Sequence, residues 1–169
     1  EIIVNEINTI PGFTKISMDL TCPAGAVDLD SLILAGGEWQ SPEPGKTVSI
    51  PASCFFHAGY SGLSSGHVLI KKDTEPADAV LFYGPKLPLA EGKYLVEFVF
   101  ASPAPLDTQL GAVDFRRHKT ICSKWHEIFA GRPALMEFTQ KQDVPFYLAF
   151  RFDRNADILI KEVKITRVE

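Results

Sequence analysis

A short basic and aromatic segment carries the residues of this chain that are best suited to hold a ligand. Arg116, Arg117 and His118 are consecutive, and Trp125 follows them within ten residues. Guanidinium groups pair with carboxylates, phosphates or sugar hydroxyls, and an exposed indole offers a flat apolar face to a sugar ring. These residues predict a carbohydrate platform. On the alternative interpretation, Trp125 fills the end of a hydrophobic core and the arginines are solvated.

Two further aromatic residues lie in segments rich in turn-forming residues. Trp39 follows a pair of glycines, and Tyr60 lies in a glycine- and serine-rich loop. Because such loops run over protein surfaces, we expect both side chains to add to the ligand surface. Either could instead pack in the core or within a turn.

The residue patterns of several common catalytic sites are absent from the sequence. It contains no HExxH helix, no His-x-His pair, and no GxxxxGK or GxGxxG phosphate loop. His57 and His67 lie ten residues apart, so a small sandwich enzyme with a histidine-based metal site remains an alternative. We expect a noncatalytic domain with no cofactor, and a structural calcium ion in a loop is left open.

The elements that must position these residues are short strands separated by glycine- and proline-rich turns. The 169 residues, 46% of them hydrophobic, suit one domain, so residues 1–169 are expected to form a single unit. A single short helix is predicted at 123–130, between a Ser123 cap and Gly131. Alternation of apolar and polar residues predicts strands at 2–7, 15–20, 27–34, 47–50, 68–71, 79–82, 94–100, 112–115, 135–138, 146–152 and 158–168.

So many short strands cannot bury their apolar faces in one open sheet. The predicted fold class is therefore all-β, a two-sheet antiparallel β-sandwich of the jelly-roll kind, with at most one short helix. Gly84-Pro85 is expected to form an elbow that ends one strand before the next.

Three segments together resemble a known kind of domain. They are Tyr83-Gly84-Pro85 with the following Gly92-Lys93-Tyr94, then 110–114, and then 150–152 with 156–165. The pattern is similar to jelly-roll, carbohydrate-binding-module-like domains that accompany bacterial glycosyltransferases and other cell-surface polysaccharide enzymes, and the likeness covers about residues 66–168. The resemblance implies a noncatalytic module that binds bacterial surface glycan. A structural domain that joins subunits through strand edges is a further alternative.

Charge and cysteine content bear on partners and compartment. The formal net charge of −4 argues against nucleic acid as a partner, and the longest apolar runs are far below the length of a membrane span. Cys22, Cys54 and Cys122 show no metal-binding spacing, so we expect buried free thiols, with one disulfide plus one free thiol as the alternative. Free thiols favour the bacterial cytoplasm over secretion or the cell surface. Because the first residue is Glu1, the chain is expected to be a module of a larger polypeptide, with that polypeptide and a glycan as its partners.

Overall fold

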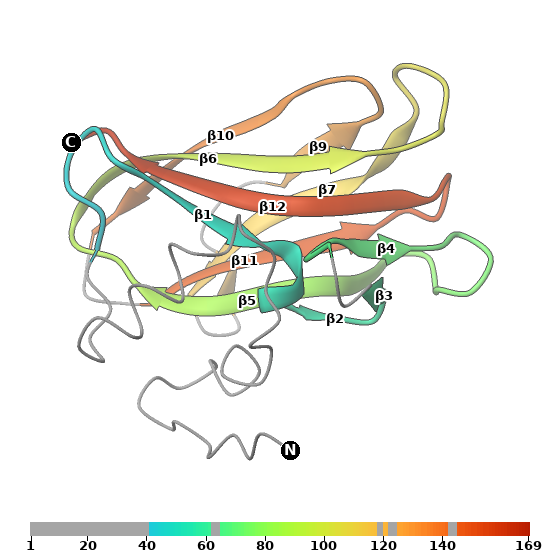
Figure 1. The fold of residues 1–169 in the computed structure, drawn as a ribbon, viewed down its shortest axis with the longest axis horizontal. Helices are drawn as coiled ribbons and strands as arrows, with labels where there is room; N and C mark the ends of the chain where they lie inside the picture. Colours follow the sequence, from blue (N-terminus) through green and yellow to red (C-terminus); the bar gives the residue numbers. More distant parts are fainter. Residues whose placement is uncertain (1–40, 62–64, 118–119, 122–124, 142–144) are drawn as a thin grey trace, which may run out of the picture.

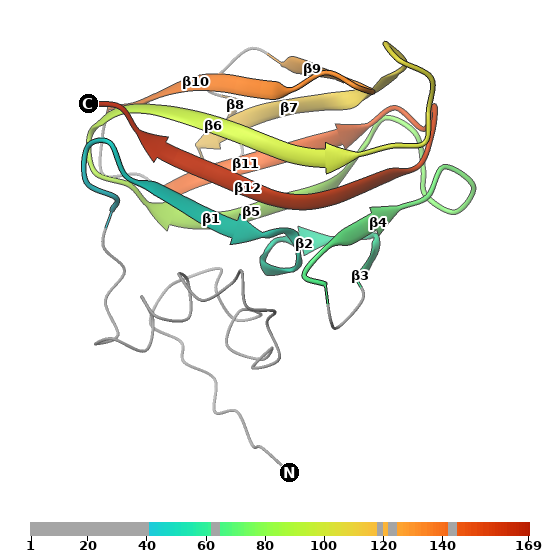
Figure 2. The same ribbon diagram turned by 45° about the horizontal axis from the view of Figure 1, so that its top comes forward.

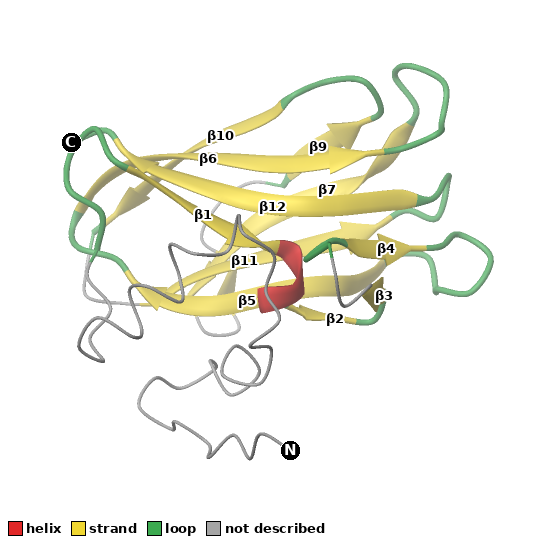
Figure 3. Cartoon of the chain, viewed as in Figure 1, coloured by secondary structure: helices red, strands yellow, loops and turns green. Residues whose placement is uncertain are grey.

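The computed structural model describes residues 41–61, 65–117, 120–121, 125–141 and 145–169. Within these residues nearly all regular structure is β-strand, and a 3-10 turn, η3 (Ala52–Cys54), is the helical exception (Figure 3). The strands predicted at 2–7, 15–20 and 27–34 lie outside the described residues, as do Trp39, His118, Cys22 and Cys122.

The described strands form two antiparallel sheets of six strands each, which face one another as layers (Figures 1 and 2). Sheet A has the order β10-β6-β12-β4-β3, and β1 also pairs with β12. Its strands are β1 (Thr47–Pro51), β3 (Tyr60–Ser61), β4 (Val68–Ile70), β6 (Gly92–Ala101), β10 (Ala134–Gln140) and β12 (Ile158–Arg167).

Sheet B has the order β2-β5-β11-β7-β8, and β9 pairs with β7. Its strands are β2 (Phe56–His57), β5 (Ala79–Pro88), β7 (Gln109–Arg117), β8 (Thr120–Ile121), β9 (His126–Phe129) and β11 (Pro145–Phe152). The predicted all-β, two-sheet antiparallel sandwich is confirmed.

Phenylalanine rings join the two sheets across the core. Phe98 of sheet A lies 5.4 Å from Phe150 and 5.9 Å from Phe82 of sheet B, measured between ring centroids. Phe138 of β10 makes a second bridge, 4.9 Å from Phe115 of β7. Aromatic pairs at these separations add about 1 kcal/mol each beyond the area they bury. These contacts fix which side of each strand faces inward.

The predicted helix at 123–130 is wrong over its described part, because His126–Phe129 is strand β9. Ile128 lies opposite Gly111 of β7 and is buried. Two helical turns are marginal by themselves, whereas a strand at this edge gains backbone hydrogen bonds from β7 and buries its β-branched residue.

The predicted elbow at Gly84-Pro85 is also wrong, because both residues lie inside β5. They pair with Leu148 and Tyr147 of β11, and the register shifts beside this pair, between Phe146 and Tyr147. Proline cannot donate a ladder hydrogen bond, and such a shift lets a strand continue past it. Cys54 is buried, as predicted.

Gly111 of β7 lies where the backbone and core of sheet B approach closely. A Cβ atom built there would stand 2.1 Å from the Arg151 carbonyl oxygen and 2.7 Å from the Phe150 ring. A methyl group at this position must push β7 away from β11. The absence of a side chain therefore lets the central strands of sheet B pair.

We expect Gly111→Ala to lower the free energy of unfolding by roughly 3 kcal/mol, the upper range for overpacking. Urea titration followed by circular dichroism measures it. Gly45→Ala is the control: its backbone has φ +78° but nothing lies within 4 Å of the added carbon, so only conformational strain of about 1 kcal/mol applies. Equal losses for the two variants would contradict the close-packing account.

Candidate functional site

Strand β11 divides its side chains between the core and the outer face of sheet B. Phe146, Leu148, Phe150 and Phe152 are buried members of the core. Successive strand residues point to opposite faces, so the intervening Tyr147, Ala149 and Arg151 lie on the outer face. The core packing of one side therefore places an aromatic ring and a guanidinium together on the other.

Three aromatic rings form a continuous patch on this outer face, which we call the aromatic patch. Phe56 of β2 lies opposite Tyr83 of β5, with ring centroids 5.3 Å apart and the rings stacked. Tyr147 of β11 lies 6.0 Å from Tyr83. All three side chains are half-buried, so each keeps some of its surface in contact with solvent.

A second group, the Trp125 cluster, lies on the same sheet toward the β9 side. The Arg151 guanidinium carbon stands 5.2 Å from the centroid of the Trp125 ring, within cation–π range. Asp153 Oδ1 is 3.5 Å from Arg151 Nη2, and Gln109 Nε2 donates to Asp153 Oδ2 at 2.8 Å. Gln109 of β7, Arg151 of β11, and the residues just after β11 and just before β9 thus form one connected polar and aromatic cluster.

Small residues separate the aromatic patch from the Trp125 cluster. Ala149 lies opposite Tyr83 on one side and Asp114 on the other, and Ala112 lies opposite Arg151 and Glu127. Because alanine side chains are short, the neighbouring rings, the guanidinium and the exposed Glu127 project beyond them. Asp114 is fully buried within this face.

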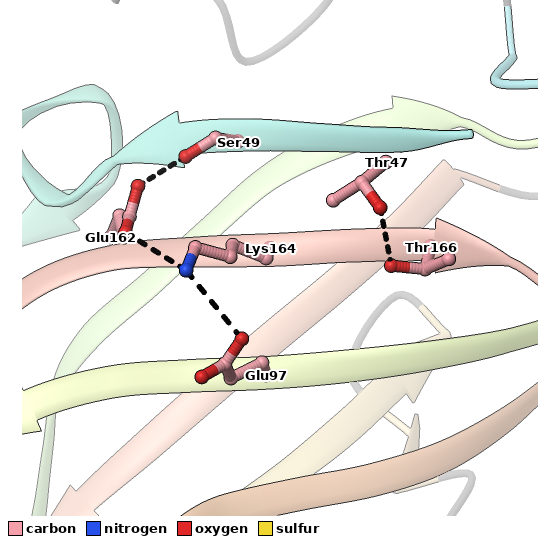
Figure 4. Close-up of polar contacts among 6 residues, drawn as sticks. All are labelled: Thr47, Ser49, Glu97, Glu162, Lys164 and Thr166. Carbon is pink, nitrogen blue, oxygen red and sulfur yellow. Dashed lines mark hydrogen bonds and ion pairs between the residues drawn. The ribbon is translucent and has the colours of Figure 1, made fainter. Parts of the chain in front are cut away.

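The outer face of sheet A carries a different set of side chains (Figure 4). Lys164 lies between Glu162, at 3.4 Å, and Glu97, at 3.6 Å. Desolvation acts to lower the Lys164 pKa, but Glu162 and Glu97 together outweigh it, so the pKa is raised. Thr47 and Thr166 share a hydrogen bond of 2.8 Å, and Ser49 donates to Glu162. Around β1, β12 and β6 this face therefore carries hydroxyl and charged groups that bond one another, whereas the exposed Tyr60 and Leu135 lie on β3 and β10 of the same sheet.

The residues predicted from sequence do not all gather at one place. Trp125 lies in the cluster described above. Tyr60 is strongly exposed but belongs to β3 of sheet A, so it is not part of that cluster. Arg116 and Arg117 end β7 and pair with Ile121 and Thr120 of β8, and their side chains lie outside the description, as do Trp39 and His118.

Sequence reasoning missed Phe56, Tyr83, Tyr147, Arg151 and Asp153. A usable signal was present in β11, where large apolar residues recur at every second position, Phe146, Leu148, Phe150 and Phe152. In such a strand the tyrosine and the arginine must share the face opposite the phenylalanines.

The residues of the histidine-based alternative lie in different sheets. His57 belongs to β2 of sheet B, and its Nδ1 lies 2.9 Å from the Gly59 carbonyl oxygen. His67 directly precedes β4 of sheet A. The described residues contain no group of three or more His, Cys, Asp and Glu side chains placed to hold a metal ion.

Gly62 to Gly66 reads GLSSG, which has the Gly-x-Ser-x-Gly spacing of a nucleophile elbow. That motif acts where a strand turns sharply into a helix. Here β3 and β4 flank the segment and pair with each other as antiparallel strands, Tyr60 opposite Leu69. The central serine lies outside the described residues, and the flanking hairpin does not supply the context that the motif needs.

Comparisons with known proteins find similarity among solved structures. A scan against protein-family models and a search of curated proteins both find no match. The chain is similar to the C-terminal CBM6 of LamC, a marine laminarinase from Zobellia galactanivorans, with 14% identity, 72% of this chain and 100% of that chain covered, and a TM-score of 0.47. It is also similar to the second N-terminal cellulose-binding domain of a Cellulomonas fimi β-1,4-glucanase, with 18% identity, 72% and 92% coverage, and a TM-score of 0.44.

A third similar structure is the apo form of the module named BiXyn10A CBM1, with 16% identity, 75% and 99% coverage, and a TM-score of 0.49. By name these are carbohydrate-binding modules, the kind of domain that the sequence resembles, whereas the association with glycosyltransferases stays a prediction. Because these identities and TM-scores are low, the evidence for the sandwich fold is the strand pairing within the chain itself. In the described part of the chain, no helix is long and apolar enough to cross a membrane.

The contact between Arg151 and Trp125 can be tested by fluorescence without any ligand. Trp39→Phe leaves Trp125 as the only indole of the chain. In that background, we expect Arg151→Ala to shift the emission to longer wavelength and to increase quenching by acrylamide, because the guanidinium no longer covers the ring.

The matched control is Arg132→Ala, which removes a guanidinium held at the same 5.2 Å over the ring of Phe129. Its emission spectrum should equal that of the Trp39→Phe parent. Unchanged emission in Arg151→Ala would show that the two side chains do not stack in solution.

Proposed function

We propose that this chain is a noncatalytic carbohydrate-binding module that holds a glycan on the outer face of sheet B. The observation that carries the proposal is that the aromatic patch and the Trp125 cluster lie on the same face. On sheet A, by contrast, the polar groups around β12 bond one another. Each ring packs against its neighbours in the sheet and keeps part of its surface exposed, so a sugar ring can stack on it. The neighbouring guanidinium and carboxylate offer hydrogen bonds to hydroxyls.

The chemistry of the described face favours binding over reaction. Phe56, Tyr83 and Tyr147 contribute apolar surface, and Arg151 is already set beside the carboxylate of Asp153. Such groups orient and hold a ligand, and none of them is a nucleophile with an adjacent base. Phe56, Tyr83, Tyr147 and Arg151 lie in strands and Asp153 directly follows one, which suits recognition because little order has to be imposed on binding.

The finer proposal concerns the glycan and the parent chain. A face of this size stacks one or two sugar rings, so we expect affinities in the micromolar to millimolar range. Modest affinity suits a module that concentrates a larger polypeptide on a polymeric ligand, where many equivalent sites repeat. We propose a bacterial surface polysaccharide as that ligand.

Tyr147→Ala should weaken binding about tenfold, because roughly 60 Å² of ring surface at about 25 cal/mol/Å² amounts to about 1.5 kcal/mol. Affinity electrophoresis and titration calorimetry measure this with soluble β-glucan, α-glucan, galactomannan and bacterial polysaccharides. Thr166→Ala is the matched control on the outer face of sheet A, and it should bind like the wild type.

Two results would overturn the proposal. One is that no glycan of the panel binds to the wild-type protein. The other is that a glycan binds and that Thr166→Ala weakens it as much as Tyr147→Ala does, since the binding face would then not be sheet B. Thermal unfolding of each variant confirms that the fold is intact.

A further inference from the structure

The described residues contain two copies of one arrangement, an aspartate beside an arginine that stacks on an aromatic ring. In the first, Arg132 lies over Phe129 and its Nε donates to Asp107 Oδ1 at 2.5 Å. In the second, Arg151 lies over Trp125 with the same ring distance, but its closest approach to Asp153 is 3.5 Å, from Nη2. The first copy shows that an arginine can stack and bond its carboxylate at once.

In the second copy the two side chains form an ion pair, but one donor and one acceptor have no hydrogen-bond partner within the described ranges. Arg151 Nε and Asp153 Oδ1 are buried atoms, and within the described part of the chain neither has a hydrogen-bond partner. Their side chains nevertheless reach the surface, with 34% and 14% of their area exposed. Asp153 is held in place from its other oxygen by Gln109. Unpaired buried polar atoms are costly and call for a partner.

The types of the two atoms define the partner that fits them. Nε donates one hydrogen bond, and a carboxylate oxygen only accepts. A hydroxyl group accepts and donates at the same time, so one sugar hydroxyl, or two on neighbouring carbons, satisfies both atoms. A carboxylate on the ligand would satisfy Nε but would leave Oδ1 without a donor and set two negative groups side by side. An ammonium group would satisfy Oδ1 and be repelled by Arg151.

We propose that Arg151 and Asp153 are specificity-determining residues that select neutral, hydroxyl-bearing sugars and reject sugars that carry a carboxylate. This inference rests on the proposed function, because it assigns a ligand class to the same face. The rings of the aromatic patch stack on neutral and charged sugars alike. The Arg151–Asp153 pair discriminates between the two kinds of sugar. Because both atoms are buried in the free protein, the proposal requires the guanidinium to rotate so that a ligand hydroxyl can reach them.

The experiment compares each neutral polysaccharide of the panel with its own derivative in which primary hydroxyls have been oxidised to carboxylates. At 0.15 M salt we expect the wild type to bind the parent polymer at least about tenfold more tightly than the oxidised one, the effect of one unpaired charged contact. In Asp153→Asn the amide can donate as well as accept. The ratio should fall to within about threefold, through weaker binding of the parent and stronger binding of the oxidised polymer.

Asp107→Asn is the matched control, because it removes the same charge from the other aspartate–arginine pair and so corrects for the net charge of the protein. It should keep the wild-type ratio. Equal binding of parent and oxidised polymers by the wild type, or an unchanged ratio in Asp153→Asn, would overturn the inference while the proposed function stood. Binding of neither polymer would instead defeat the proposed function itself, and circular dichroism of both variants excludes misfolding as the cause.

Discussion

The packing of Phe150 against Phe98 across the sandwich is the interaction on which the rest of the structure depends. It holds β11 of sheet B against β6 of sheet A, and Phe82 joins from β5. Because alternate residues of β11 point into this core, the residues between them must point to the outer face of sheet B. The site is thus a consequence of core packing: Tyr147 and Arg151 lie on the outer face because Phe146, Phe150 and Phe152 lie on the inner one.

The outer faces of the two sheets differ in their surface chemistry. On sheet A the charges and hydroxyls neutralise and bond one another, as Lys164 does between Glu97 and Glu162. Exposed pairs of this kind add little to stability, and they keep a broad sheet face well hydrated. On sheet B the rings of the aromatic patch are partly exposed, and Arg151 Nε and Asp153 Oδ1 have no hydrogen-bond partner among the described residues. This asymmetry is why the outer face of sheet B is the candidate binding face.

Much of the fold could be predicted from the sequence because strand periodicity is local. The alternation at 94–100, 146–152 and 158–168 marks β6, β11 and β12 almost to the residue. The prediction failed where a distant partner decides the outcome. His126–Phe129 is a strand because β7 lies beside it, and Gly84-Pro85 continues β5 because β11 shifts its register there. For the site, Trp125 could be singled out by type alone. Tyr83 and Tyr147 are 64 positions apart, and only the pairing of β5 with β11 brings their rings together.

The most direct test of the account is to map the binding face by NMR titration of the isotope-labelled protein with a polysaccharide that it binds. The account predicts that shift changes concentrate on β5, β11 and the start of β9, at Tyr83, Tyr147, Arg151 and Trp125. Amides of Thr47, Lys164 and Thr166 should stay unchanged. Changes centred on the outer face of sheet A, with the sheet B residues unaffected, would contradict it.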